Sequence, residues 1–236
     1  MLPNIFRTGI EPPVGNVQTF ERKYRFFLRP GESKRVLFLQ DEKDFVNYHE
    51  HEIVLPTGRV RVWCSRSNDS RNRCYLCDLG LKKYWVAVGT ILDLDGFITR
   101  EGRRVKPVKR IYAIKYRSSS VLSMYIRDLM SEIPNFTLKY AEFKVSRTPT
   151  SNSPSSGDLF TFVKIWKKED VEKLASENGI SLSPYQPSDF VTIYTDYKML
   201  ENWYNTEIKP LLEDETPPDD DVEEFEDLGG DKDVEF

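Results

Sequence analysis

All of the cysteines and histidines of the chain lie within one short stretch of the sequence: His49, His51, Cys64, Cys74 and Cys77. Cys74 and Cys77 have the separation that lets one metal ion bind both thiolates. Cys64 supplies a third sulfur, and one of the two histidines completes a tetrahedral shell of the kind that zinc prefers. A full shell leaves no position open to water, so the sequence predicts one structural zinc ion. The alternative is a set of buried structural cysteines with surface histidines.

The net charge of −4 averages two unlike regions. Residues 211–236 contain 13 Asp or Glu and one lysine, whereas residues 1–210 contain 33 Lys or Arg and 25 Asp or Glu. A basic body therefore precedes an acidic tail. The alternatives for such a tail are a disordered, solubilising end and a segment that competes with nucleic acid for the basic body or binds partner proteins.

No apolar run approaches the ~20 residues needed to cross a bilayer, and the N-terminus lacks the residue order of a signal peptide. With three cysteines, an odd number, a disulfide framework is a poor interpretation. We therefore expect a cytoplasmic protein with no membrane partner.

Short stretches of β-branched and aromatic residues predict strands, at 35–39, 59–64, 84–92, 110–117, 136–145 and 159–166. Fewer stretches have helical periodicity, and these are 118–130, 168–178 and 196–208. The sequence predicts a mainly β protein with a few helices (α+β), built as a small barrel or sandwich. Residues 1–20 are expected to form an N-terminal arm, 148–157 a mobile loop, and 212–236 a disordered acidic tail.

Basic residues and tyrosines alternate in the middle of the chain, as they do in grooves that bind single-stranded nucleic acid through phosphates and stacked bases. This run contains Arg103, Arg104, Lys106, Lys109, Arg110, Tyr112, Lys115, Tyr116 and Arg117. A second basic cluster surrounds the cysteines and contains Arg59, Arg61, Arg66, Arg71 and Arg73. Tyr112 and Tyr116 are expected on one face of a strand. The alternatives are core aromatics, with Trp63 and Trp85 the best candidates, and a solvated basic loop.

The spacing His51-x12-Cys64-x9-Cys74-x2-Cys77 resembles the zinc module of the T-even bacteriophage single-stranded DNA-binding (helix-destabilising) proteins. Tyr84-Trp85 and Lys115-Tyr116-Arg117 are similar to further motifs of that family, and the likeness covers roughly residues 35–165. The resemblance selects His51 rather than His49 as the fourth ligand.

That resemblance implies an OB-fold-like five-stranded barrel within residues 21–211, with an inserted zinc module at about 47–82. It also implies sequence-independent binding of single-stranded DNA rather than RNA, with Tyr84 among the contacts, in phage-type replication, recombination and repair in the host cytoplasm. An enzyme is not expected. The family arm used for self-association on DNA is basic, whereas Met1–Ile10 has only Arg7. The terminal Asp233-Val234-Glu235-Phe236 looks like the partner-docking tip of bacterial and T-odd phage single-strand binders, which dock replication and recombination proteins.

We expect the tail to lie across the basic groove and to be displaced by DNA. Deleting residues 213–236 should then tighten DNA binding, most visibly at low salt. Unchanged affinity after deletion would leave the tail as a spacer. The alternative function is a zinc-dependent RNA-binding or protein-interaction and transcription-accessory module.

Overall fold

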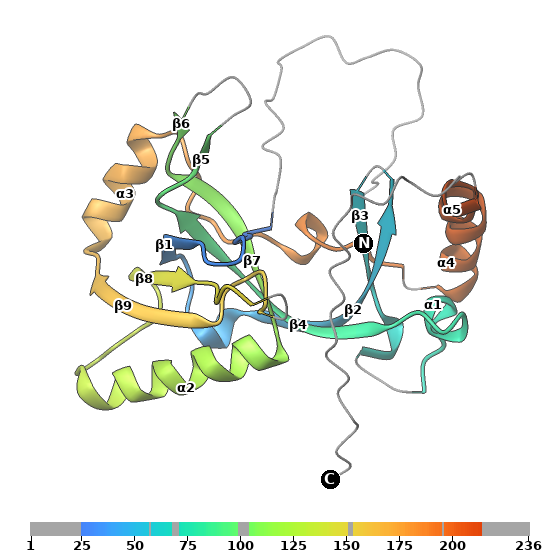
Figure 1. Ribbon diagram of the computed structural model, residues 1–236, viewed down its shortest axis with the longest axis horizontal. Helices are drawn as coiled ribbons and strands as arrows, with labels where there is room; N and C mark the ends of the chain where they lie inside the picture. Colours follow the sequence, from blue (N-terminus) through green and yellow to red (C-terminus); the bar gives the residue numbers. More distant parts are fainter. Residues whose placement is uncertain are drawn as a thin grey trace.

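The computed structural model describes residues 25–56, 58–67, 71–98, 104–150, 153–194 and 196–213 (Figure 1). Its main sheet contains β1 (Ser33–Phe38), β2 (Val46–Leu55), β3 (Gly58–Trp63), β4 (Lys83–Asp93), β7 (Val108–Lys115), β8 (Ala141–Ser146) and β9 (Leu159–Ile165). A separate hairpin joins β5 (Phe97–Ile98) to β6 (Arg104–Val105). The helices are α1 (Tyr75–Asp78), α2 (Tyr116–Glu132), α3 (Lys168–Glu177), α4 (Tyr197–Trp203) and α5 (Lys209–Glu213), and a π-helical turn, Tyr204–Ile208, joins the last two.

Strand β4 is the central element of the sheet, because it pairs with three other strands. Its first half pairs with β2, its last residues pair with β1, and β7 runs antiparallel along most of its length. Most of its side chains are buried, which explains why its sequence is a nearly continuous apolar run. Gly89 is required within it, because the ring of Phe45 lies 2.5 Å from the place that a Cβ atom would occupy.

The largest core cluster lies where β1, β7 and β8 meet α2. Phe38 is at its centre and makes edge-to-face contacts with Tyr112 and Phe143, each with a centroid separation of 5.5 Å. Such pairs add ~0.5–1.5 kcal/mol beyond the burial of their area. The core therefore takes up most of the aromatic residues that alternate along the strands.

Residues 180–194 connect this core to the part of the molecule that carries the cysteines (Figure 1). Tyr185 donates its backbone N–H to the hydroxyl of Thr90 on β4 (2.8 Å). Further along, Thr192 exchanges backbone hydrogen bonds with Trp63 (2.9 Å) and Arg61 (3.0 Å) on β3. Helix α4 then packs on α1, with Leu200 and Ile208 in the same cluster as two of the cysteines. The C-terminal helices therefore support the region around the cysteines.

The prediction of a mainly β protein with a few helices is confirmed. The sheet has seven strands in the described residues and does not close, so the finer expectation of a closed five-stranded barrel is not confirmed. Strand β2 was missed, because its polar run Asn47–Glu52 hides the alternation of buried and exposed positions. No described helix is both long and apolar enough to cross a membrane.

Two local expectations were wrong. The strand expected at 110–117 ends at Lys115, and Tyr116 is the first residue of α2. The strand expected at 136–145 begins only at Ala141, after a turn in which Tyr140 has a φ of 65°. The mobility expected of the loop at 148–157 stays a prediction, and Ser153 and Ser156 within it are buried.

Candidate metal centre and nucleic-acid interface

The four residues with the expected metal-binding spacing converge from three parts of the fold. His51 lies in β2, and Cys64 directly follows β3. Cys74 directly precedes the short helix α1, and Cys77 lies within it. Their ligand atoms all lie within 4.8 Å of one another. The side chains of His51, Cys64 and Cys74 are buried. These residues can therefore hold one metal ion that water does not reach freely.

The distances between the ligand atoms fit a single ion. The Sγ atoms of Cys64 and Cys77 are 3.5 Å apart, and the Nε2 atom of His51 is 3.5 Å from Cys74 Sγ and 3.4 Å from Cys77 Sγ. A tetrahedral zinc ion with Zn–S bonds of about 2.3 Å places sulfur ligands ~3.8 Å apart. Thiolate and imidazole donors in a tetrahedral set favour zinc over hard cations such as magnesium. The donor set is therefore consistent with zinc.

The orientation of the histidine is set by a neighbouring backbone carbonyl. His51 Nδ1 lies 3.0 Å from the carbonyl oxygen of Lys82, so Nδ1–H donates and Nε2 is left with a lone pair that points toward the sulfurs. An outer hydrogen bond of this kind fixes the tautomer of metal-binding histidines. Lys82 directly precedes β4, and Lys83 is the cross-strand partner of His51. The orientation of His51 in the candidate metal centre therefore depends on the backbone at the start of β4.

The cysteine thiols share protons among themselves. A hydrogen bond from the Cys64 thiol, with a further contribution from His51, lowers the pKa of Cys74 to about 2. The same hydrogen bond and burial raise the pKa of Cys64. Burial is also the first cause that raises the pKa of Cys77. A divalent ion would replace these shared protons, because metal binding requires deprotonated thiolates.

The arginines around the metal centre are paired with acids of the same region. Arg66 and Arg73 both bond to Asp78, at 2.7 Å and 3.3 Å. Arg59 and Arg61 both bond to Glu52, at 2.6 Å and 3.0 Å, and Arg71 is exposed. These arginines hold the loop and the hairpin in place as well as adding positive charge. Ion pairs near the protein surface contribute little to stability.

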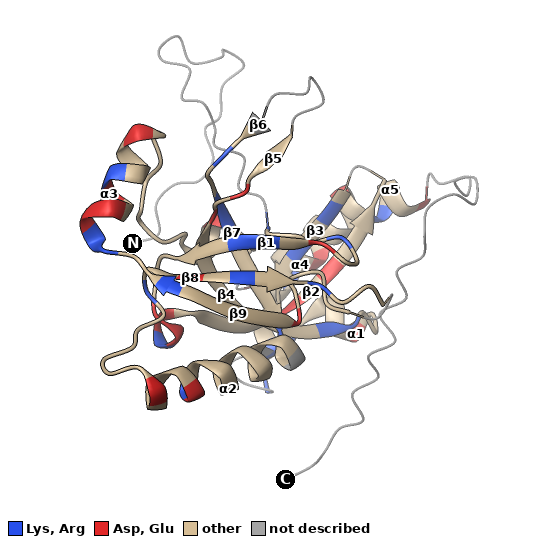
Figure 2. Ribbon diagram, turned by 60° about the vertical axis from the view of Figure 1, so that its left-hand side comes forward, with Lys and Arg blue, Asp and Glu red and all other residues tan. Residues whose placement is uncertain are grey.

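The basic residues of the 103–117 run are spread over different surroundings (Figure 2). Lys109 is buried, with its ammonium 4.3 Å from the centre of the Tyr185 ring. Arg110 is half-buried, whereas Lys106 and Lys115 are exposed. Arg103 and the side chains of Arg104 and Arg117 lie outside the described residues. The sequence run therefore does not form one continuous basic strand face.

The tyrosines of this run also separate. Tyr112 is fully buried and donates its hydroxyl to the carbonyl oxygen of Ser156 (3.1 Å). Burial raises its pKa. The expectation that Tyr112 stacks on a base is wrong, because core side chains such as Phe26 and Phe38 cover its ring. Tyr116 lies on α2 with 66% of its surface exposed, so the two rings do not share a strand face.

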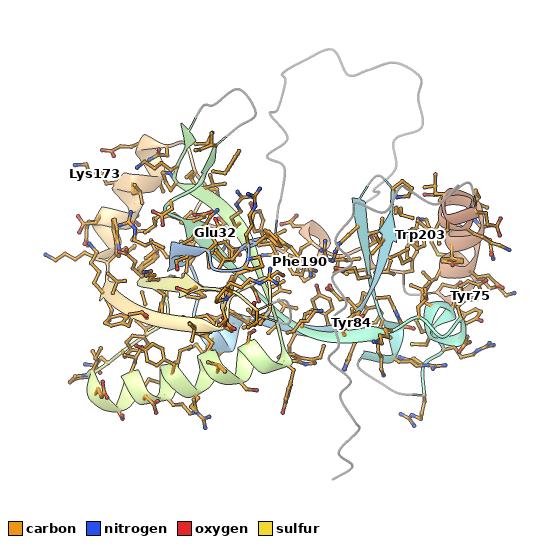
Figure 3. The ribbon with its side chains drawn as sticks, in the orientation of Figure 1. Glu32, Tyr75, Tyr84, Lys173, Phe190 and Trp203 are labelled. Carbon is orange, nitrogen blue, oxygen red and sulfur yellow. The ribbon has the colours of Figure 1, made fainter. Side chains whose placement is uncertain are left out.

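The start of β4 brings aromatic and basic side chains together on both faces of the sheet. Tyr84 lies on one face, with the ammonium of Lys115 4.4 Å from the centre of its ring (Figure 3). Trp85 lies on the other face, because successive strand residues alternate, and its ring centroid is 5.9 Å from that of Tyr116. We call these four residues the β4 junction. Trp85 is half-buried and packs against the largest core cluster, in line with the sequence alternative that counted it among the core aromatics.

The remaining sequence-predicted sites lie outside the described residues. These are the N-terminal arm at 1–20 and the docking tip Asp233, Val234, Glu235 and Phe236, while α5 extends to Glu213 before the described chain ends. No protein-family model and no curated protein sequence matches the chain.

Proposed function

We propose that this chain binds single-stranded DNA without sequence preference, as a non-enzymatic protein whose structural zinc ion supports the binding site. The observation that carries the proposal is the β4 junction. Two aromatic rings and a lysine ammonium lie at the strand that runs directly from the metal centre into the core. In this proposal the sheet is an open relative of the OB-fold, a fold in which strands and loops present such residues to single strands.

The chemistry of the β4 junction accounts for binding without sequence preference. Every base has a π-face, and stacking of a base on an aromatic side chain is worth ~1–3 kcal/mol. Lys115 supplies positive charge for phosphates beside Tyr84, and the exposed Lys83 does so on the face of the sheet that carries Trp85. About four to six phosphate contacts would give a log–log salt slope of roughly −3 to −4 on a single strand.

The metal centre supports the β4 junction through the backbone. The carbonyl of Lys82 holds His51, and Tyr84 lies two residues further along the chain, opposite Glu50. An ion that fixes His51 therefore also fixes the start of β4. This proposal gives zinc a positioning role, in agreement with a shell that has no open position.

The experiment that tests the function is a titration of the full chain with oligo(dT), followed by the intrinsic fluorescence of its tryptophans and tyrosines. We expect saturable quenching, because bases that stack on Trp85 and Tyr84 change the fluorescence of those rings. Oligo(dA) of the same length should give a similar affinity, and duplex DNA a much weaker one. The same titration with RNA tests the choice of nucleic acid. The absence of any saturable change with oligo(dT) would contradict the proposal.

A further inference from the structure

A pocket of about 750 Å³ opens between the N-terminal segment 25–34, the end of β4 and the hairpin strand β5. Its lining includes two phenylalanines, Phe27 and Phe97, and the basic residues Arg25, Arg29, Lys34 and Arg110. Of these six, only Arg110 belongs to the basic run recognised in the sequence. The combination of apolar rings and cations is what a nucleotide needs, since its base is flat and its phosphate is negative.

One wall of the pocket is an extended segment that is fixed by the core. Phe26 and Leu28 are buried, so Arg25, Phe27 and Arg29 point to the opposite side. The backbone of the segment is held by two hydrogen bonds, because the N–H of Phe26 donates to the carbonyl of Ile111 (2.7 Å) and the N–H of Leu28 donates to the carbonyl of Ser155 (2.8 Å). Phe27 remains 50% exposed. A half-exposed phenylalanine on a fixed backbone is a preorganised surface for stacking.

The opposite wall carries a second ring with a cation beside it. The guanidinium of Arg110 lies 5.1 Å from the centre of the Phe97 ring, and Phe97 itself is 37% exposed. This wall therefore repeats the pairing of an aromatic ring with a cation that Tyr84 and Lys115 form at the β4 junction.

The acidic residues of the pocket are already neutralised by neighbouring cations. Asp93 is buried, with Lys34 at 3.3 Å and Arg110 at 3.9 Å. Glu32 lies 3.8 Å from Lys34 and accepts the backbone N–H of Arg29. Arg35 neutralises Asp95, at 3.1 Å. The guanidinium of Arg29, in contrast, has no ion pair or hydrogen bond with the described residues, so it is available to a phosphate.

Arg25 links the pocket to the β4 junction through an ion pair and a strand pairing. Arg25, which lines the pocket, donates two hydrogen bonds to Glu50, of 2.7 Å and 2.6 Å. Glu50 is the cross-strand partner of Tyr84, and such partners lie about 4.5–5.5 Å apart. A strand bound at Tyr84 can therefore pass Arg25 and enter the pocket.

We infer that this pocket is a second nucleotide subsite, which receives the part of a DNA single strand that continues past Tyr84. A base stacks on Phe27, and the adjoining phosphate lies at Arg29. The inference rests on the proposed function and adds to it a subsite with its own residues.

The test compares Phe27→Ala and Arg29→Ala with the unchanged full chain, using oligo(dT) and an abasic oligonucleotide of the same length. Phe27→Ala should weaken binding of oligo(dT) by roughly 5-fold to 100-fold and leave binding of the abasic strand unchanged. Arg29→Ala should weaken binding of both and lower the magnitude of the salt slope by about 0.7. Arg127→Ala is the matched control, because Arg127 is exposed on α2, away from the pocket.

The outcomes distinguish the subsite from the function. If the unchanged chain binds oligo(dT) and both pocket variants bind it with the same affinity and salt slope, the subsite is wrong and the function stands. If the unchanged chain does not bind oligo(dT), both are wrong. Since Arg29 is exposed, its variant tests the subsite even if Phe27→Ala proves unstable.

Discussion

Removal of zinc is expected to unfold the region around α1 and the β2–β3 hairpin while the main core stays folded. Structural zinc contributes an apparent ~10–16 kcal/mol in small peptides, compared with ~5–15 kcal/mol for the stability of a whole domain. Helix α1 has only four residues, too few to be stable alone. Hydrogen exchange should therefore show lost protection in β3 and α1 after chelation and retained protection in α2. Equal protection in both states would contradict a structural role.

The two histidines provide a matched pair for this prediction. His51→Ala should abolish the binding of one equivalent of zinc or weaken it strongly, because it removes a ligand whose Nε2 faces two sulfurs. His49→Ala should keep one equivalent, because His49 lies outside the cluster of ligand atoms. Metal analysis of both purified variants makes the comparison. Loss of zinc from His49→Ala alone would overturn the assignment of the ligands.

Tyr84→Ala is expected to weaken the binding of oligo(dT) by roughly 5-fold to 100-fold, through loss of stacking. Lys115→Ala should have a smaller effect at high salt than at low salt, because it removes a charge whose contribution is screened. Fluorescence titrations at two salt concentrations measure both effects. Tyr84 is half-buried and Lys115 is exposed, so neither substitution opens a large cavity in the core.

Tyr112→Phe is the control for Tyr84→Ala, because it also alters a tyrosine and lies on the neighbouring strand. It removes only the hydroxyl that bonds to Ser156, at a cost to stability of ~1 kcal/mol. Its affinity for oligo(dT) should match that of the unchanged chain. If Tyr84→Ala also binds as the unchanged chain does, the β4 junction is not the stacking site.

The candidate metal centre, a cluster of one histidine and three cysteines, could be predicted from the sequence because it depends on few residue types and on short spacings. Two cysteines separated by two residues place their sulfurs close enough to bind one ion. The third cysteine directly follows β3, which pairs with the strand that carries His51. The carbonyl of Lys82 that orients His51 could not be predicted, since backbone groups leave no signal in the residue types. It depends on the pairing of β2 with β4, and β2 itself was missed.

The proposed nucleic-acid interface was harder to predict, because aromatic residues in strands serve both cores and binding surfaces. Tyr112 and Tyr116 have the spacing of two residues on one strand face. Because β7 ends at Lys115 and α2 begins at Tyr116, however, the two rings do not lie on the same face. The pocket beside Phe27 depends on which side of an extended segment faces the core. The side that faces the core depends on hydrogen bonds to β7 and to residues 153–157, which are distant in sequence.

The proposed link between zinc and DNA binding is tested by the affinity of one protein preparation for oligo(dT) in three states: with zinc bound, after chelation, and after zinc has been returned. We expect saturable binding in the first state, strong weakening in the second and recovery in the third, because in this proposal zinc holds the start of β4 in place through His51 and Lys82. The same affinity with and without zinc would contradict it.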